Sequence, residues 1–201
     1  MTEILDMTTK HCTVERDGAV VILTMNRPEK KNALSGDMLA GLVLGYEYID
    51  ENPDIRCAIL TGAGGNFSSG ADLVAMGQQS DDPKVQEVMA RGNNPHWKAL
   101  LRDYRLSKPL VAAVEGFAVA GGTEILQGTD IRVAGEGAIF GVWEAKRGLF
   151  PLGGSACRLA SKTSAAPSHA VNALIVRRCR LRIRCGRAAV RTIVEIDGYA
   201  W

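Results

Sequence analysis

The sequence predicts a single α/β domain over residues 1–160, followed by an arginine-rich tail over residues 161–201. Short apolar runs that favour strands alternate with helix-like segments up to residue 160, which is the pattern of an α/β fold. Two of the strand-like runs lead into glycine-rich turns, which let bare backbone approach a ligand. With 201 residues, of which 46% are hydrophobic, the chain is long enough to bury a sizeable core.

The first half of the chain predicts a hairpin, a helix and a buried strand. Asp17-Gly18 separates two strand-like runs, and this dipeptide is a strong hairpin signal. Ser35 can cap a helix that stops at Asn52-Pro53, because apolar residues recur between them at spacings of three and four. The predicted elements are a hairpin of residues 13–16 and 19–25, a helix after Ser35, and a strand over residues 55–61.

The second half predicts helical segments and further short strands. Residues 81–106 have a helical composition, but Gly92-Asn93-Asn94-Pro95 divides them into two pieces. A buried strand over residues 110–114 precedes Gly121-Gly122, after which a helix can start at Thr123. The remaining strand-like runs are residues 131–134 and 138–140, on either side of a glycine turn, and residues 174–176 and 190–194 in the tail.

Composition argues against a metal site, a disulfide framework and a membrane span. The five cysteines lack CxxC spacing and the three histidines are scattered. No window approaches the roughly 18 uninterrupted apolar residues of a membrane helix, and the first ten residues include acids and no apolar run. These features predict a cytoplasmic protein.

Charge is unevenly distributed along the chain. From Arg177 onward there are seven arginines against two acidic residues, a local charge of +5. Residues 1–176 therefore carry 17 basic and 20 acidic groups. The predicted domain is mildly acidic and the tail is strongly basic.

The turn and helix around Gly121 predict a corner that suits a negative oxygen. A helix that begins here points free N–H groups, and the positive end of its dipole, at whatever lies in front of it. Glu124 follows three residues later, so its carboxylate can lie close to the position that the Gly121 N–H faces. The alternative, given equal weight on this stretch alone, is a packing device in which Glu124 only complements the helix dipole.

Residues 62–73 form the second glycine-rich loop. They contain neither the GK[ST] of a phosphate-binding loop nor a GxGxxG pattern, yet they offer another backbone turn that can face a ligand. The glycines at positions 62–65 are better explained as turn formers than as ligands.

Four phrases occur in order along the chain: NRPEKKNALS, FSSGADL, VEGFAVAGGTEI and FGVWEAKRGLFPLGG. In this order and at these separations they resemble the crotonase family, the enoyl-CoA hydratases and isomerases, from about residue 13 to about residue 159. The resemblance implies a crotonase-like spiral core of ββα units, an acyl-CoA substrate, a place in fatty acid metabolism, and no cofactor besides the CoA thioester itself.

The resemblance also implies the reacting groups. The N–H groups of Ala71 and Gly121 would hold the thioester oxygen and stabilise an enolate. Glu124 and Glu144 match two glutamates that add water to a trans-2-enoyl-CoA, with Glu124 activating the water and Glu144 transferring the proton at the α-carbon. Neighbouring carboxylates repel, so at least one raised pKa is expected. Family isomerases often lack one glutamate, so the presence of both favours a hydratase, with an isomerase as the alternative.

Contacts with the CoA moiety follow from the resemblance as well, partly through the main chain. Lys30 and Lys31 could screen the CoA phosphates, or they could form a solvated surface loop. Trp143 stands where relatives often have a smaller residue or proline, which would narrow the acyl site. The implied binding residues are Lys31, Ala33, Leu34, Ser69, Gly70, Asp72, Leu73 and Gly122.

The family pattern ends near Leu159, where relatives continue through helices that cover the acyl site and help build a trimer. We hypothesise that residues 161–201 are an out-of-frame translation, so that the C-terminal helical part is missing or replaced. Activity would then be impaired, with an acyl-CoA-binding remnant as the limiting case, and a homo-oligomer (a trimer or dimer of trimers) would require that the interface survives.

A rival hypothesis makes the basic tail functional, through binding of nucleic acid or an anionic membrane. The tail has no aromatic interleaving and no nucleic-acid motif, so no nucleic-acid partner is predicted.

Overall fold

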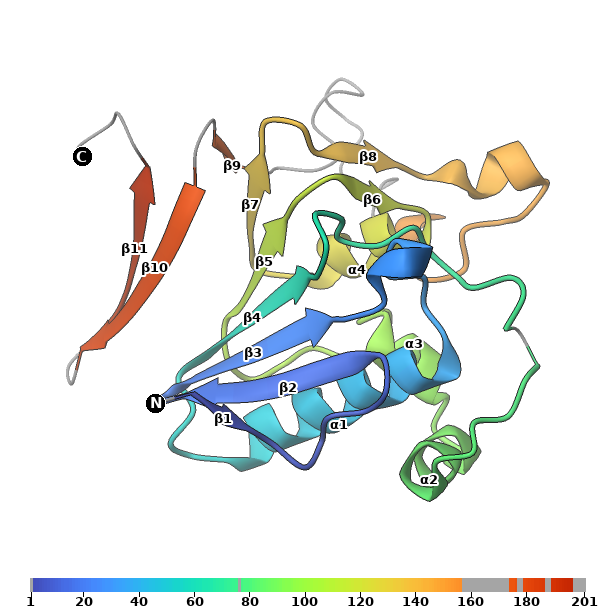
Figure 1. Cartoon of the computed structure of the whole chain (residues 1–201), viewed down its shortest axis with the longest axis horizontal. Helices are drawn as coiled ribbons and strands as arrows, with labels where there is room; N and C mark the ends of the chain where they lie inside the picture. Colours follow the sequence, from blue (N-terminus) through green and yellow to red (C-terminus); the bar gives the residue numbers. More distant parts are fainter. Residues whose placement is uncertain (1, 76, 157–173, 177–178, 187–188, 197–201) are drawn as a thin grey trace.

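A seven-stranded sheet forms the centre of the computed structural model, which describes residues 2–75, 77–156, 174–176, 179–186 and 189–196 (Figure 1). Its spatial order is β1 (Glu3–Ile4), β2 (Cys12–Asp17), β3 (Val20–Met25), β4 (Cys57–Gly62), β5 (Leu110–Val114), β7 (Ile131–Gly135) and β9 (Leu174–Val176). The first three strands pair antiparallel, and the sheet is parallel from β3 onward. The α/β prediction is confirmed.

The predicted hairpin is β2 and β3, but its turn lies one residue later than expected. Asp17 pairs with Val20, so Gly18 and Ala19 form the two-residue loop. Gly18 has φ 60°, which glycine adopts without steric cost and which suits the first position of such a turn. The position that requires positive φ therefore fixes the register of the hairpin.

Helix α1 (Gly36–Glu51) packs closely on the antiparallel end of the sheet (Figure 1). The Ser35 side chain accepts a hydrogen bond from the Met38 N–H, which confirms the predicted cap. A Cβ on Gly45 would lie 2.3 Å from Leu23 Cδ2, and one on Gly41 would lie 2.5 Å from Cys12 Cβ. These two glycines let the helix backbone approach the sheet more closely than any larger residue would allow.

Two short helices, α2 (Pro83–Ala90) and α3 (Pro95–Ala99), pack on α1. Glu47 on α1 forms ion pairs with Arg91 at 2.9 Å and with Lys98 at 2.8 Å, so one carboxylate joins both short helices to α1. The predicted break between them is confirmed. The predicted helical run to residue 106 is wrong, because α3 ends at Ala99 and the buried Leu101 has φ 55°, which no helix accommodates.

A second layer carries the remaining elements of the domain. Strands β6 (Phe117–Val119) and β8 (Ile139–Gly141) form a parallel two-stranded sheet, and α4 (Gly121–Gly128) follows β6 directly. The 3-10 helix η2 (Trp143–Arg147) continues from β8. Strand β6 was not predicted, because three residues between two glycine turns carry no periodic signal.

In the described part of the tail, β9 joins the central sheet and two longer strands form a separate hairpin. These are β10 (Cys179–Gly186) and β11 (Ala189–Ile196), which pair antiparallel (Figure 1). The two strand-like runs of the tail correspond to β9 and the middle of β11. Residues 157–173, which hold most of the first half of the tail, lie outside the described residues.

Candidate active site

Asn32 joins the loop after β3 to the loop after β4. Its side-chain oxygen accepts the Arg27 N–H at 2.8 Å, and its Nδ2 donates to the carbonyl oxygens of Ala63 (2.8 Å) and Asn66 (2.7 Å). The side chain is fully buried and the residue has φ 54°, a conformation that asparagine adopts more readily than most residues. The two loops therefore form one rigid unit, which sequence reasoning did not foresee.

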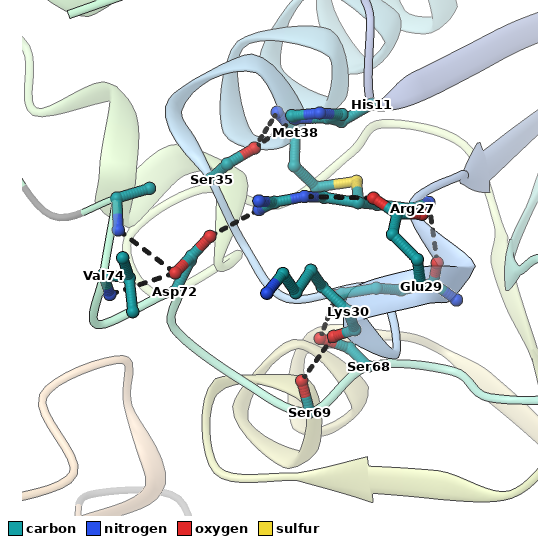
Figure 2. Close-up of polar contacts among 12 residues, drawn as sticks. His11, Arg27, Glu29, Lys30, Ser35, Met38, Ser68, Ser69, Asp72 and Val74 are labelled. Carbon is teal, nitrogen blue, oxygen red and sulfur yellow. Dashed lines mark hydrogen bonds and ion pairs between the residues drawn. The ribbon is translucent and has the colours of Figure 1, made fainter. Parts of the chain in front are cut away.

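Arg27 and Asp72 hold the next part of this unit together (Figure 2). Both side chains are largely buried, and the Asp72 carboxylate also accepts the N–H groups of Val74 (3.0 Å) and Ala75 (3.1 Å). Burial alone would raise the pKa of Asp72, but hydrogen bonds from Arg27 and from the two N–H groups outweigh it, so the pKa is lowered. Asp72 is thus an anionic anchor for residues 72–75.

Ser35 connects the same region to the start of α1. Its hydroxyl oxygen accepts the Met38 N–H and lies 2.7 Å from His11 Nδ1 (Figure 2). Burial, followed by the charge of Arg27, lowers the pKa of His11, which favours a neutral ring that accepts the Ser35 proton.

The loop that contains Ala71 is held by Leu34 so that the Ala71 N–H faces away from that residue. Leu34 donates to the Gly70 oxygen at 2.8 Å and accepts from the Asp72 N–H at 3.2 Å. Successive peptide groups of an extended segment face opposite sides, so the intervening Ala71 N–H faces away from Leu34. Among the described residues, neither the Ala71 N–H nor the Gly121 N–H donates a hydrogen bond.

The two free donors lie next to each other. A Cβ on Gly121 would lie 3.8 Å from the Ala71 nitrogen, and a Cβ on Gly70 would lie 3.1 Å from the Gly121 nitrogen. Glycine is required at position 70, where φ is 89° and an added Cβ would also lie 2.7 Å from Ala120 Cβ. The dipole of α4 lies behind the Gly121 donor, and the role of the two N–H groups as oxyanion donors stays a prediction.

Ala120 makes the sharp turn from β6 into α4. It has φ 51° and ψ −125°, which is unfavourable for a residue with a Cβ and costs about 1–3 kcal/mol. Its N–H donates to the Gly141 oxygen at 2.7 Å, and its carbonyl accepts the Glu124 N–H at 3.1 Å. Strand β8 and α4 together hold this strained turn, which places the Gly121 N–H at the end of the helix.

Glu124 is almost fully buried on the first turn of α4. Its Oε1 accepts the Ser155 N–H at 3.1 Å. A Cβ on Gly153 would lie 2.3 Å from Glu124 Oε2, so the chain near residue 153 also closes over the carboxylate. The predicted proximity of Glu124 to the Gly121 corner follows from their shared helical turn.

Glu144, on η2, lies close enough to Glu124 for their charges to interact. Burial raises the pKa of Glu144, a hydrogen bond from its own N–H offsets part of this rise, and the charge of Glu124 adds a smaller upward shift. Its Oε2 is buried and accepts no hydrogen bond from the described residues. The expected raised pKa of one carboxylate is confirmed, and the group with the raised pKa is the one assigned to proton transfer.

Apart from Gly122, which lies on α4, the residues expected to contact CoA lie in the loops that Asn32 joins. Ala33, Leu34, Gly70, Asp72 and Gly122 are buried, whereas Lys31 and Leu73 are exposed. Ser69 donates its N–H to the Lys31 oxygen (2.9 Å) and its hydroxyl to the Lys30 oxygen (3.2 Å). The structure therefore brings the two sequence segments together, and their role in CoA binding stays a prediction.

Lys31 belongs to a row of four side chains in which two aromatic rings lie between two lysines. Its Nζ lies 4.3 Å from the Phe117 ring centre, Phe117 meets Trp143 edge-to-face at 6.0 Å, and Lys146 Nζ lies 4.6 Å from the Trp143 ring centre. Trp143 also packs on Gly141, where a Cβ would lie 2.3 Å from its Nε1. These contacts fix the residue that precedes Glu144, and a narrowing of the acyl site by Trp143 stays a prediction.

A family model described as "Enoyl-CoA hydratase/isomerase" matches residues 15–176 of this chain. The chain belongs to the enoyl-CoA hydratase/isomerase family. The match extends past Leu159, where the motifs recognisable in the sequence end, and reaches β9.

Named relatives agree with this assignment. The chain is 55% identical over 146 residues to enoyl-CoA hydratase EchA19 of Mycobacterium tuberculosis, covering 73% of this chain and 54% of that protein. It is 38% identical over 140 residues to mevalonyl-coenzyme A hydratase sidH of Aspergillus fumigatus, covering 70% and 50% respectively. The chain thus spans about half the length of the curated relatives it matches.

Solved structures show the same fold. An enoyl-CoA hydratase from Mycobacterium tuberculosis H37Rv superposes with a TM-score of 0.65 at 36% identity, covering 75% of this chain and 56% of that one. Enoyl-CoA hydratase EchA1 of Mycobacterium marinum gives 0.64 at 36% identity, with the same coverage. The predicted crotonase-like core is confirmed. Within the described part of the chain, every helix is too short or too polar to cross a membrane.

Proposed function

We propose that this chain binds a trans-2-enoyl-CoA and adds water across its double bond. The observation that carries the proposal is the convergence of two backbone N–H groups, those of Ala71 and Gly121, with two carboxylates, of which Glu144 has a raised pKa. Neither N–H donates a hydrogen bond to any of the described residues. The N–H pair suits a thioester oxygen that becomes negative. The carboxylates suit one proton acceptor and one proton donor.

The reaction follows from these groups. The two donors polarise the thioester carbonyl and so draw electrons from the double bond, which leaves the β-carbon electrophilic. Ionised Glu124 takes a proton from water as the water oxygen bonds to the β-carbon. Protonated Glu144 gives a proton to the α-carbon of the enolate. The net change is addition of a hydroxyl at the β-carbon and a hydrogen at the α-carbon, and solvent restores the two carboxyl groups.

The names of the relatives agree on a CoA thioester as the substrate but differ in its acyl group. Besides the mevalonyl-CoA hydratase, a relative from Thauera aromatica is a (E)-benzylidenesuccinyl-CoA hydratase, 36% identical over 135 residues. These two acyl groups differ widely, while the CoA thioester and the hydration are common to both names. Our proposal is therefore restricted to the enoyl-CoA class.

The test follows loss of the enoyl-thioester absorbance when the full chain meets crotonyl-CoA. Glu124→Gln and Glu144→Gln should each lower kcat by about 10²-fold or more, since each removes one acid/base group. Glu136→Gln, an exposed glutamate in the turn after β7, is the matched control and should retain full activity. Equal turnover by all four proteins would refute the assignment.

A non-catalytic acyl-CoA-binding protein is the second candidate, because the chain matches only about half of each curated relative. It is distinguished by calorimetry: CoA-ester binding without turnover favours it, whereas turnover excludes it. An isomerase is distinguished by product analysis, since it moves the double bond without adding water.

The remaining proposals concern the tail and assembly. Reading the coding DNA of residues 161–201 in the other two frames tests the out-of-frame hypothesis, and the absence of a family-like helical continuation in both frames would refute it. Light scattering tests the proposed trimer or dimer of trimers. Retention on heparin before and after deletion of residues 177–201 tests the rival charge-based role of the tail.

A further inference from the structure

Gln127 and Ser155 form a buried contact next to the proposed active site. Gln127 lies on α4, three residues after Glu124, so the two side chains project from neighbouring positions of one helix face. Its Nε2 lies 2.9 Å from Ser155 Oγ. The same Ser155 donates its N–H to Glu124 Oε1 at 3.1 Å. The two hydrogen bonds, from Gln127 to Ser155 and from Ser155 to Glu124, therefore connect two positions of α4 through one serine.

Gln127 occupies this position at a cost in stability. Its side chain is 8% exposed, and its Oε1 is buried without a hydrogen-bond partner among the described residues. A buried polar atom without a partner costs about 1–3 kcal/mol, so an apolar side chain of the same length would suit the fold better. A glutamine retained under this penalty points to a role other than stability.

We propose that Gln127 and Ser155 are positioning residues that fix the carboxylate of Glu124. The proposal rests on the proposed hydratase function. Ser155 lies in the segment after Pro151, and this segment reaches Glu124 only through tertiary packing. The side-chain hydrogen bond that joins Ser155 to α4 comes from Gln127. Holding Ser155 at one height along the helix keeps its N–H aimed at Oε1, which fixes the orientation of the Glu124 carboxylate.

Positioning predicts a specific pattern of kinetic effects. Gln127→Met removes the hydrogen bond at nearly constant volume, and Ser155→Ala removes the hydroxyl while it keeps the backbone N–H. Each should lower kcat by about 10-fold with little change in KM, because a carboxylate displaced by a fraction of an ångström reacts more slowly. The double variant should lose no more than either single variant, since both changes break the same contact.

Stability separates this role from a structural one. Gln127→Met should melt at the wild-type temperature or above it, because the buried unpaired oxygen is gone. The matched control is Gln86→Met on α2, an exposed glutamine that also donates one hydrogen bond, at 2.7 Å to the Ser80 oxygen, and kcat should be unchanged there. Unchanged kcat in Gln127→Met, additive losses in the double variant, or a kcat loss matched by a lower melting temperature would each overturn the proposal.

A second measurement keeps the inference testable if the wild type shows no turnover, in which case the hydratase function fails on its own. Amide hydrogen exchange at Ser155 reports the hydrogen bond to Glu124 directly. Exchange in the full chain should be at least about 10-fold faster in Gln127→Met than in the wild type. An unchanged exchange rate would refute the positioning role independently of catalysis.

Discussion

Gly122→Ala should weaken the oxyanion site by adding a single methyl group. The new Cβ would lie 2.8 Å from the Ser68 oxygen and 3.0 Å from Ser68 Cβ, whereas ordinary contact begins at 3.4 Å. The start of α4 and the loop at Ser68 must therefore separate by about 0.6 Å. Ser68 is itself held against β6, because its N–H donates to the Phe117 oxygen at 2.8 Å and its oxygen accepts the Val119 N–H at 3.0 Å.

This separation moves the Gly121 N–H relative to the Ala71 N–H. Complete loss of one oxyanion donor costs about 10²–10³ in kcat, so a partial displacement should cost about 10- to 100-fold. Because the loss falls on the transition state, kcat and kcat/KM should fall together in the crotonyl-CoA assay. Overpacking should also lower the free energy of unfolding by about 1–3 kcal/mol.

The control is Gly137→Ala, since an added Cβ there meets nothing within 4 Å and the residue is exposed. Its kcat should equal that of the wild type. The reasoning fails if Gly122→Ala keeps kcat within about twofold of the control, because the close approach of Ser68 to Gly122 would then not set the distance between the two donors.

Three further changes test the environment of the site. Glu144→Gln should raise the free energy of unfolding at pH 8 by less than about 1 kcal/mol, seen as a higher melting temperature, and should leave both unchanged below pH 4. The reason is that the raised pKa of Glu144 makes its ionised form unfavourable in the fold; a larger gain at low pH would contradict this sign. Asn32→Ala should cost about 3–4 kcal/mol in urea unfolding, since three hydrogen bonds are lost in a buried position, and a cost under 1 kcal/mol would show that the loops hold without it. Asp72→Asn should cost up to about 3 kcal/mol at pH 7 because Arg27 loses its partner. The lowered pKa of Asp72 means that its ionised form supplies stability that disappears as pH falls through that pKa, so the difference between Asp72→Asn and the wild type should shrink at low pH; a constant difference would count against the ion pair.

The buried loop supports could not be predicted from the sequence. Asn32 belongs to a recognisable phrase, but its role depends on carbonyl oxygens of Ala63 and Asn66, more than thirty residues away. The same holds for Arg27, whose partner Asp72 is 45 residues further on. The sequence did contain one indication of these contacts, because a buried polar side chain in a loop needs a hydrogen-bond partner. Only the fold identifies that partner.

Several features of this protein are set by the sequence itself. Gly18 at the hairpin turn, the Ser35 cap and the apolar spacing of α1 depend on local sterics and hydrogen bonding, which act within a few residues. The four phrases likewise indicated the family and the residues of the proposed site. Tertiary structure alone decided how those residues meet: the adjacency of the Ala71 and Gly121 donors, the interaction between Glu124 and Glu144, and the Ser155 contact all join segments distant in the chain. Such contacts depend on the packing of two layers against each other, and no local pattern records the resulting distances.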